Sequence, residues 1–219
     1  MKKKNRLVFF NDKFVEEKYA KLSIYDSALM FGDMVFEMTR SFNKKQFLLE
    51  KHIDRLLAGL KILRVNIKYS KKELINICEK TADKNQDNLN KDDEHRLMID
   101  VSRGVLGIYE ETTDENKGPN VIVADFPLRW TVKVMSNLFN DGINLVITSQ
   151  RAIPPMFMDP KIKNRSRMFY LNANIEASLF KGKNNWALLL DSNGYIAEGS
   201  GSNFFMVKDG KVLTPRGVH

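Results

Sequence analysis

Short apolar runs separated by polar turn residues mark the first 50 positions of the chain. Such runs predict β-strands, here at positions 7–10, 34–38 and 46–48. The connecting residues, Asn11-Asp12 and the stretch 43–45, are of types that favour tight turns. The N-terminal part of the chain therefore predicts strands that include a hairpin.

The apolar spacing changes at Lys51, where apolar side chains begin to recur every three or four residues. This spacing puts them on one face of a helix, and the positions are Ile53, Leu56, Leu57, Leu60 and Leu63. A second helix is predicted over 71–82, with Cys78 among its inward residues. The polar run 83–94 predicts a solvated loop in which nothing is buried.

The rest of the chain alternates between the two patterns. Strands are predicted at 97–101, 121–124, 143–147, 187–190, 195–197 and 203–207, and the run 143–147 has the pattern of a buried strand. A helix is predicted over 166–180, with Met168, Leu171, Ile175 and Leu179 on or near one face. The sequence therefore predicts a mixed α/β (α+β) fold with a small N-terminal subdomain (1–125), a linker (126–142) and a larger C-terminal subdomain (143–219).

Composition narrows the possible classes of protein. The 219 residues are 43% hydrophobic, which is too high for a disordered chain. No apolar run reaches the roughly 18 residues of a membrane span, and no apolar segment follows the basic start, so we expect a cytoplasmic protein. The net charge of +8 is spread along the chain and mixed with acidic residues, which argues against nucleic acid as the main partner. The densest basic cluster is 161–167.

The sequence contains no clear motif for a metal site, a catalytic nucleophile or a phosphate-binding loop. His52, His95 and His219 each lack a neighbouring ligand at metal-binding spacing. Gly199-Ser200-Gly201 stands between predicted strands and not before a helix, as a nucleophile elbow would require. No Gly-rich phosphate loop with its lysine occurs.

Three separated groups of residues stand out instead. The first is Phe31–Glu37 followed by Arg40, and the second is Lys51–Leu56, with Arg55 on the polar edge of a helix. The third group comprises Ile162–Ser166, Glu176-Ala177, Leu189–Asp191 and Tyr195–Phe204. Each group alone is a weak signal, but their order along the chain is specific.

In this order the groups resemble the class IV (fold-type IV) aminotransferases, and among them the branched-chain enzymes. These proteins use pyridoxal 5′-phosphate, and the family also contains D-amino-acid aminotransferases, R-selective amine transaminases and aminodeoxychorismate lyases. The resemblance runs from about Leu7 to the last residue and is closest at Glu198–Phe204. It implies a two-subdomain fold, transamination between an amino acid and a 2-keto acid, and a homodimer.

The resemblance also implies roles for particular residues. Lys163 stands at the position of the lysine that binds the cofactor covalently, with Lys161 as a less well-spaced competitor. The lysine must be neutral to attack an aldehyde, and nearby cations lower its pKa. Lys161, Arg165 and Arg167 could supply those cations.

The other implied cofactor contacts come from both parts of the chain. Arg55 resembles the arginine that binds the phosphate, and Glu198 the carboxylate that pairs with the pyridine nitrogen, where it keeps the ring an effective electron sink. Gly201, Ser202 and Asn203 form a turn of small residues that lets backbone approach the cofactor. Arg40 and Arg96 are expected to meet a substrate carboxylate, and Phe36 to line an apolar pocket.

The sequence also departs from the family pattern. Ser166 replaces an Asn and Arg167 a Tyr found in relatives, and Tyr170 is a possible substitute for that Tyr. Relatives continue beyond the position of Pro215, so we expect either a fragment or a chain without a complete site. A branched-chain or other apolar L-amino acid is favoured as substrate because the residue pairs of the D-amino-acid enzymes and the lyases are missing after Arg103-Gly104. A non-catalytic scaffold that keeps the fold, and a polyanion-binding module, stay as alternatives.

Overall fold

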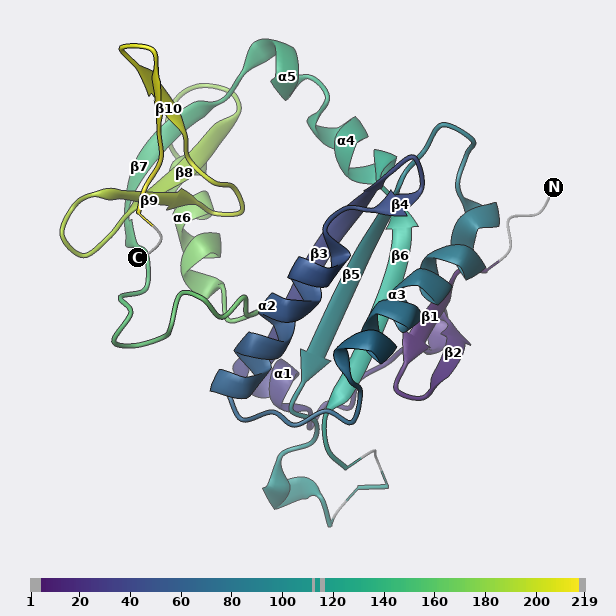
Figure 1. Ribbon diagram of the computed structural model, residues 1–219. Coiled ribbons are helices and arrows are strands. Elements are labelled where there is room, and N and C mark those ends of the chain that lie inside the picture. The colour runs from purple at the N-terminus through teal and green to yellow at the C-terminus, as the bar shows by residue number, and fades with distance from the viewer. Residues whose placement is uncertain (1–4, 112, 115–116, 217–219) are drawn as a thin grey trace. The chain divides into compact units, whose positions relative to one another are not determined.

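Two units, each built on its own sheet, make up the computed structural model, in which residues 5–111, 113–114 and 117–216 are described (Figure 1). The first unit comprises the chain up to Lys133 together with Lys161–Ser166. The second comprises Val134–Pro160 and the chain from Arg167 onward. The segment around Lys163 therefore belongs to the N-terminal unit, although it lies well beyond the end of that unit's main stretch in the sequence.

The first unit is a six-stranded sheet in the order β2-β1-β6-β5-β3-β4, in which neighbouring strands pair antiparallel. Its strands are β1 (Leu7–Phe10), β2 (Lys13–Glu16), β3 (Met34–Phe42), β4 (Lys45–Gln46), β5 (His95–Ser102) and β6 (Asn120–Pro127). Its α-helices are α1 (Ser27–Phe31), α2 (Leu49–Ile62) and α3 (Lys71–Asn85). Short 3₁₀ turns are η1 (Glu17–Tyr19), η2 (Gln86–Asn88) and η3 (Gly107–Tyr109).

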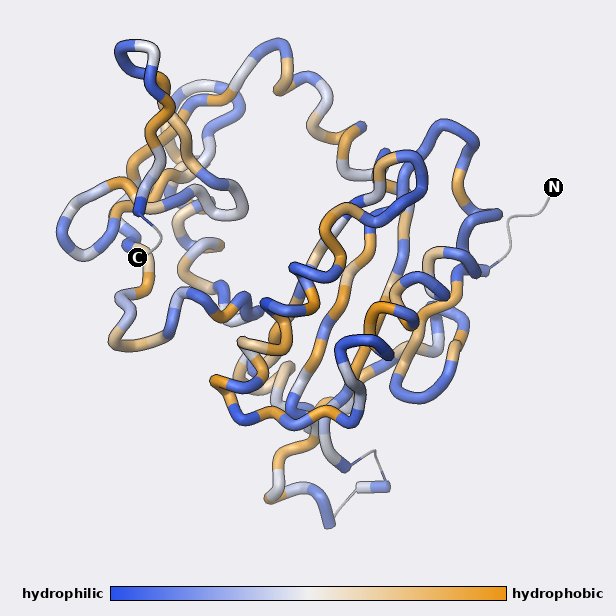
Figure 2. Tube along the Cα trace, in the orientation of Figure 1, coloured by the Kyte–Doolittle hydropathy of each residue, from blue (hydrophilic) through white to orange (hydrophobic). Residues whose placement is uncertain are grey.

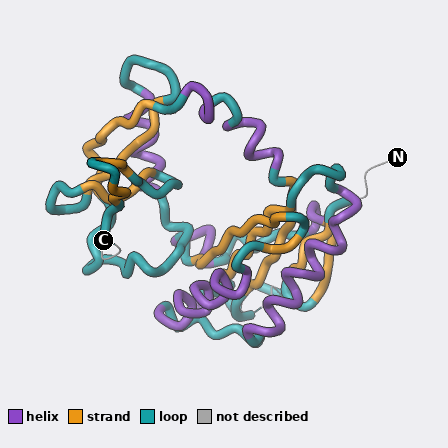
Figure 3. The backbone as a smooth tube through the Cα atoms, turned by 45° about the horizontal axis from the view of Figure 1, so that its top comes forward, coloured by secondary structure: helices purple, strands orange, loops and turns teal. Residues whose placement is uncertain are grey.

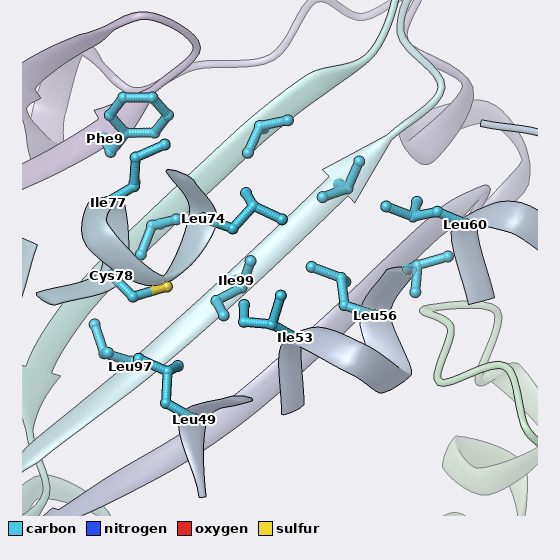
Figure 4. Close-up of a cluster of buried hydrophobic side chains, with 14 of the residues drawn as sticks. Phe9, Leu49, Ile53, Leu56, Leu60, Leu74, Ile77, Cys78, Leu97 and Ile99 are labelled. Carbon is cyan, nitrogen blue, oxygen red and sulfur yellow. The ribbon is translucent and has the colours of Figure 1, made fainter. Parts of the chain in front are cut away.

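Helices α2 and α3 lie on the same face of this sheet and bury their apolar stripes against it (Figures 1 and 3). Figure 2 shows the apolar residues recurring along both helices, as the three-to-four spacing predicts. Together with the inward residues of β3, β5 and β6 they form a core of large aliphatic side chains, including Leu56, Leu74, Leu97 and Ile99 (Figure 4). Cys78 is fully buried in this core, and burial raises the pKa of its thiol to about 12.

Local turn chemistry explains the hairpin between β3 and β4. Asn43 and Lys44 both have positive φ, which gives the tight two-residue turn that matches the twist of an antiparallel pair. The predicted strand at 46–48 is wrong in extent, because the strand ends at Gln46 and Leu48 enters the left-handed region just before α2. The hairpin itself is confirmed.

The predicted solvated loop at 83–94 is wrong. Helix α3 continues to Asn85, whose fully buried side chain bonds to both backbone groups of Leu7 and to the carbonyl of Thr81. Asn88 and Asp93 are also buried. Polar residues can be buried where their hydrogen bonds are satisfied, as those of Asn85 are, and polarity alone did not reveal this.

The second unit contains a three-stranded sheet in the order β7-β8-β9, with a parallel β7–β8 pair, and a separate hairpin. Its strands are β7 (Asn144–Arg151), β8 (Asn185–Leu190), β9 (Ile196–Gly199), β10 (Met206–Lys208) and β11 (Lys211–Leu213). Helix α6 (Met168–Ser178) connects β7 to β8, and α5 (Leu138–Asp141) precedes β7. Helix α4 (Arg129–Met135) begins in the first unit and ends in the second.

One expectation for the second unit is wrong. The run 143–147 is not buried, because β7 is an edge strand in which Leu145 and Ile147 are exposed. Met168, Leu171, Ile175 and Leu179, which were predicted on or near one face of helix α6, are exposed. The helix packs instead through Ala173 and Ala177, whose small side chains allow close approach to the sheet residues Ala187 and Leu189.

Candidate active site

Lys163 lies in a short segment that runs along β3 of the first unit. The backbone N–H of Phe36 donates to the carbonyl of Lys163 at 2.8 Å, and Asn164 forms a β-bridge with Val35. The Nζ of Lys163 is 4.6 Å from the centre of the Phe36 ring, and Phe36 is only 3% exposed. The structure therefore brings together two residues that the sequence proposed for the site, and backbone bonds join the lysine's segment to β3.

Arg40 and Arg96 stand opposite each other on β3 and β5. They line a cavity of about 260 Å³ together with Met38, Thr39, Phe47, His52 and Leu128. Burial lowers the pKa of Arg96, and its Nη2 lies 3.3 Å from the sulfur of Met38. Two guanidinium groups beside apolar side chains suit a small molecule that has a carboxylate and an apolar body.

Arg55, on α2, is bound by a residue that the sequence did not single out. Its Nε and Nη2 donate to the two carboxylate oxygens of Glu37, the latter at 2.8 Å, and His52 Nδ1 lies 2.7 Å from the same carboxylate. Glu37 is fully buried, and burial alone would raise its pKa. The bonds from Arg55 and His52 outweigh this effect and hold the pKa of Glu37 below its ordinary value.

Glu37 and His52 therefore belong with Arg55, although neither residue was assigned a role from the sequence. The signal was present, because Glu37 stands in the same motif as Phe36 and Arg40, and His52 three residues before Arg55. A carboxylate inside an apolar strand pattern needs a buried partner, and this reasoning could have paired Glu37 with the nearest helix cations. The Nη1 group of Arg55 takes no part in the pair, and about half of the side chain is exposed.

Glu198 lies on β9 in the second unit, where the hydroxyl of Tyr170 on α6 donates to its Oε1. The pKa of Tyr170 is raised, first by burial and then by the bond to Glu198. The guanidinium of Arg167 lies 4.5 Å from the Tyr170 ring centre. Tyr170, considered in the sequence as a possible cofactor contact, thus binds the carboxylate that would pair with the cofactor ring.

Gly201, Ser202 and Asn203 begin three residues after Glu198 and are exposed. The backbone N–H of Gly199 donates to the carbonyl of Ser202 at 2.9 Å, which closes the turn. A Cβ at Gly199 would stand 2.5 Å from Ser202 Oγ, so the serine side chain would have to turn away, whereas a Cβ at Gly201 would meet nothing within 4 Å. The turn therefore leaves open space beside its backbone at Gly201.

The proposed site residues thus fall into four local groups. Three lie in the first unit: Lys163 with Phe36, Arg40 with Arg96, and Arg55 with Glu37 and His52. The fourth, Glu198 with Tyr170 and the turn 201–203, lies in the second unit. A larger cavity of about 540 Å³ in the second unit, lined by residues such as Tyr195, Phe204 and Arg216, contains none of the proposed site residues.

The family profile and the relatives that match this chain point to the same family. The profile of the family described as amino-transferase class IV matches residues 34–218. The chain is 34% identical over 208 residues to a protein of Methanocaldococcus jannaschii that is assigned provisionally as a branched-chain-amino-acid aminotransferase, and this match covers 95% of the chain and 67% of the relative. It is 31% identical over 220 residues to the branched-chain-amino-acid aminotransferase of Salmonella typhimurium, covering 97% of the chain and 67% of that enzyme.

Solved structures agree with this result. The branched-chain amino acid aminotransferase of Escherichia coli superposes with a TM-score of 0.82 at 27% identity, over 97% of this chain and 68% of that one. The T.th. enzyme with pyridoxamine 5′-phosphate gives a TM-score of 0.78 at 28% identity, over 96% of this chain and 67% of that one. The chain belongs to the class IV aminotransferases. It spans about two thirds of the length of these relatives.

Membership in the class IV aminotransferases confirms the predicted family, the predicted type of enzyme and the mixed α/β fold-type IV architecture. The roles assigned to individual residues, and the subdomain boundaries at 125 and 143, stay predictions. No helix in the described ranges is long and apolar enough to cross a membrane.

The donor set of this class IV aminotransferase fits pyridoxal phosphate. A half-buried amine (Lys163) suits the aldehyde, a partly exposed guanidinium with a free edge (Arg55) suits the dianionic phosphate, and a carboxylate (Glu198) suits the ring nitrogen. Glu198 engages Tyr170 through Oε1, which leaves its second oxygen for another partner. The small-residue turn with open space at Gly201 adds room beside backbone.

Proposed function

We propose that the chain catalyses pyridoxal-phosphate-dependent transamination between a branched-chain or other apolar L-amino acid and a 2-keto acid. The observation that carries this proposal is Lys163, the lysine at the family position, held half-buried over the Phe36 ring by a backbone bond to β3. Pyridoxal phosphate is the cofactor of the family, and it is consistent with the cofactor forms in the solved T.th. structures. When bound, it supplies an electron sink for the carbanion formed at the substrate Cα.

The residues of the chain would act as follows. Lys163 would hold the cofactor covalently and would be released when the amino donor binds. Its Nζ would then take the proton from the substrate Cα and deliver it to the cofactor carbon C4′. Glu198 accepts a hydrogen bond from the ring nitrogen, and Arg55 binds the phosphate with the edge that Glu37 leaves unused. Ser202, Asn203 and the backbone at Gly201 would contact the cofactor beside Glu198.

Substrate selection is proposed for the cavity around Arg40 and Arg96. These residues lie on the same face of the sheet as Phe36, because side chains alternate along a strand and Arg40 is four residues from Phe36. The arginines would bind the carboxylate, and Met38, Phe47 and Leu128 would receive an apolar side chain. The matched relatives are assigned to branched-chain amino acids, which favours this substrate class over D-amino acids, R-amines and lyase substrates.

We also propose that the protein works as a homodimer in the cytoplasm. The family resemblance supports the dimer, and the lack of a spanning helix in the described ranges is compatible with the compartment. Size-exclusion chromatography with light scattering would report the oligomeric state directly.

The test of the function is covalent labelling. Purified protein is treated with pyridoxal phosphate, reduced with borohydride, and digested, and the modified peptide is identified by mass. We expect one dominant adduct at Lys163, lost in Lys163→Arg and kept in the matched control Lys161→Arg. Addition of leucine or valine before reduction should deplete the adduct by at least tenfold. Adducts scattered over surface lysines, unchanged by amino acids, would show that the chain does not act as an aminotransferase.

Substrate binding has its own test. Arg40→Met and Arg96→Met should each raise the KM for a carboxylate-bearing amino donor by about 10–100-fold, because a charge-assisted hydrogen bond contributes about 1.5–3 kcal/mol. The kcat should change much less, since the carboxylate is bound equally in ground and transition states. If both variants instead lower kcat and leave KM unchanged, these arginines lie outside the substrate site.

A further inference from the structure

Arg165 lies two residues from Lys163 on the same segment along β3. Its backbone N–H donates to the carbonyl of Met34 at 2.9 Å, while Phe36 donates to the carbonyl of Lys163. In this extended pairing, side chains two residues apart point to the same face. Lys163 and Arg165 therefore both project toward Phe36.

Both cations contact the same aromatic ring. The guanidinium carbon of Arg165 is 3.8 Å from the centre of the Phe36 ring, and Lys163 Nζ is 4.6 Å from it. The two charged groups are therefore at most about 8.4 Å apart, which is close to one Debye length at physiological ionic strength. A change in the charge of one group is felt by the other.

Arg165 is fixed by a buried carboxylate on the neighbouring strand. Its Nε and Nη2 donate to Asp100 Oδ1 at 2.9 and 2.8 Å, and Asp100 is the direct register partner of Phe36 across β3 and β5. Asp100 is 6% exposed, and this burial raises the pKa of its carboxyl, an effect that Arg165 opposes. The charge that Arg165 brings to the Lys163 segment is therefore offset.

An ion pair at this place has no evident value for the stability of the fold. Apolar residues of similar volume often stabilise a buried position as well as an ion pair does, because charges lose hydration on burial. On the helix-covered face of the same strands, the neighbours Val35, Ile99 and Val101 are apolar, and the buried ion pair there, Glu37 with Arg55, also belongs to the proposed site. The pair occurs where the proposed reactive amine lies, which calls for a role there.

We propose that Asp100 and Arg165 are positioning residues for Lys163: the pair holds the Phe36 ring beneath the amine and balances the charge beside it. This inference rests on the proposed function of Lys163. Arg165 gives a fixed cation at the ring, and Asp100 offsets its charge. The Lys163 amine is thereby kept in one position, and the electrostatic field at it is set by the Arg165–Asp100 pair.

Other charged groups of the first unit lie on the Lys163 segment or on the strands beside it, and they stay unchanged in the test. They are Lys161 on its own segment, Arg40 on β3, Arg96 on β5, and the Asp33–Arg103 pair at the adjoining ends of β3 and β5. Glu37, His52 and Arg55 belong to the other face, toward α2. Differences between variants therefore report on Asp100 and Arg165.

The test measures the reactivity of the Lys163 amine without cofactor. Each protein is labelled with trace acetic anhydride between pH 6 and 11, and acetylation of each lysine is quantified by mass. Acetylation follows the neutral amine, so the midpoint of each profile reports its protonation. Asp100→Asn leaves the Arg165 cation unbalanced and should move the Lys163 midpoint down by about 0.5–1.5 pH units. Arg165→Met leaves the negative charge of Asp100 without its partner and should move the Lys163 midpoint up. If Asp100 becomes protonated in this variant, the midpoint should be no lower than in the native protein.

Two further variants separate charge from folding. The double variant Asp100→Asn/Arg165→Met should return the midpoint close to the native value, and Arg165→Lys should restore it at least halfway from that of Arg165→Met. Asp12→Asn, which removes the exposed Asp12–Lys68 pair of the same unit, is the matched control and should leave the Lys163 profile unchanged. Circular dichroism of every variant verifies that it is folded.

The outcomes are distinct from those of the cofactor-labelling test. A Lys163 midpoint that does not fall in Asp100→Asn, or that falls equally in Arg165→Met, overturns the proposed pair even if pyridoxal phosphate labels Lys163. Conversely, shifted midpoints in a protein that pyridoxal phosphate does not label at Lys163 would uphold the electrostatic coupling and refute the transaminase function.

Discussion

The two units of the chain differ in how they hold their proposed site residues. In the first unit, sixteen of the described residues form a core of mostly large apolar side chains, and the proposed site groups next to it are fixed by buried carboxylates. In the second unit, the core among the described residues consists of Ala173, Ala177, Ala187 and Leu189. Its proposed cofactor turn, 201–203, is exposed.

This difference in packing indicates which of the proposed site residues are held in place by the surrounding fold. A strand packed between a full core and a buried ion pair has few alternative arrangements, so Lys163 and Arg55 are held by their surroundings. The turn after Glu198 depends mainly on short-range hydrogen bonds, such as Gly199 to Ser202. We therefore expect substitutions in the first unit to cost more stability than equivalent substitutions in the second.

The largest expected effect concerns the two cores. Leu97→Ala in the first unit should lower the free energy of unfolding by about 4 kcal/mol, because large neighbours cannot close the cavity. Leu189→Ala in the second unit should cost about 3 kcal/mol, since its neighbours are small and fewer contacts are lost. Both leucines are fully buried, which makes the pair matched.

The two tryptophans allow each unit to be followed separately. Trp130 lies in the first unit and Trp186 in the second, so Trp186→Phe and Trp130→Phe backgrounds each leave one reporter of urea unfolding. A larger loss for Leu189→Ala than for Leu97→Ala would reverse the comparison.

The next effect concerns the buried carboxylate Glu37. Glu37→Gln should lower the free energy of unfolding at pH 7 by about 1–3 kcal/mol, because the charged hydrogen bonds to Arg55 and His52 are lost. The pKa of Glu37 is lower in the folded state than its ordinary value of 4.5, so its stabilisation is present above that value and is lost as the pH falls through the folded-state pKa. The Tm values of the native and variant proteins should therefore converge below pH 4.5.

Glu176 in the second unit provides the control for this pH dependence. Bonds from Ser149 lower the pKa of Glu176 as well, but Glu176 is less buried than Glu37. Glu176→Gln should change the acid limb of the Tm profile less than Glu37→Gln does. Parallel native and Glu37→Gln profiles from pH 7 to pH 3 would contradict the role assigned to the Glu37 bonds.

The smallest effect concerns the helix ends. Helix α3 begins with a capping box in which the Ser70 side chain accepts from the backbone of Glu73 and the Glu73 side chain accepts from Ser70. Ser70→Ala should cost about 1 kcal/mol. Helix α6 has no side-chain cap at Arg167, and Ser178→Ala at its other end should stay within about 0.5 kcal/mol. If urea unfolding shows that Ser70→Ala and Ser178→Ala lower the free energy of unfolding equally, the capping box does not distinguish the two units.

The sequence by itself determined much about this protein. The spacing of hydrophobic residues predicted helices α2 and α3 and the strands β3, β5 and β6, because one face of each is buried in the same core. The order of the motifs around Arg55, Lys163 and Glu198 was enough to indicate the family, since these residue types at this spacing have few other uses.

Only the tertiary structure decided the partners of the charged residues. Asp100 and Arg165 are 65 positions apart, and Glu37 and Arg55 are 18 apart, so their pairing depends on strand register and helix placement. Burial of Asn85 and exposure of β7 were likewise decided by which element packs beside them. A hydrophobic pattern reports which positions can be buried, whereas the register of distant strands determines which polar groups meet and are satisfied.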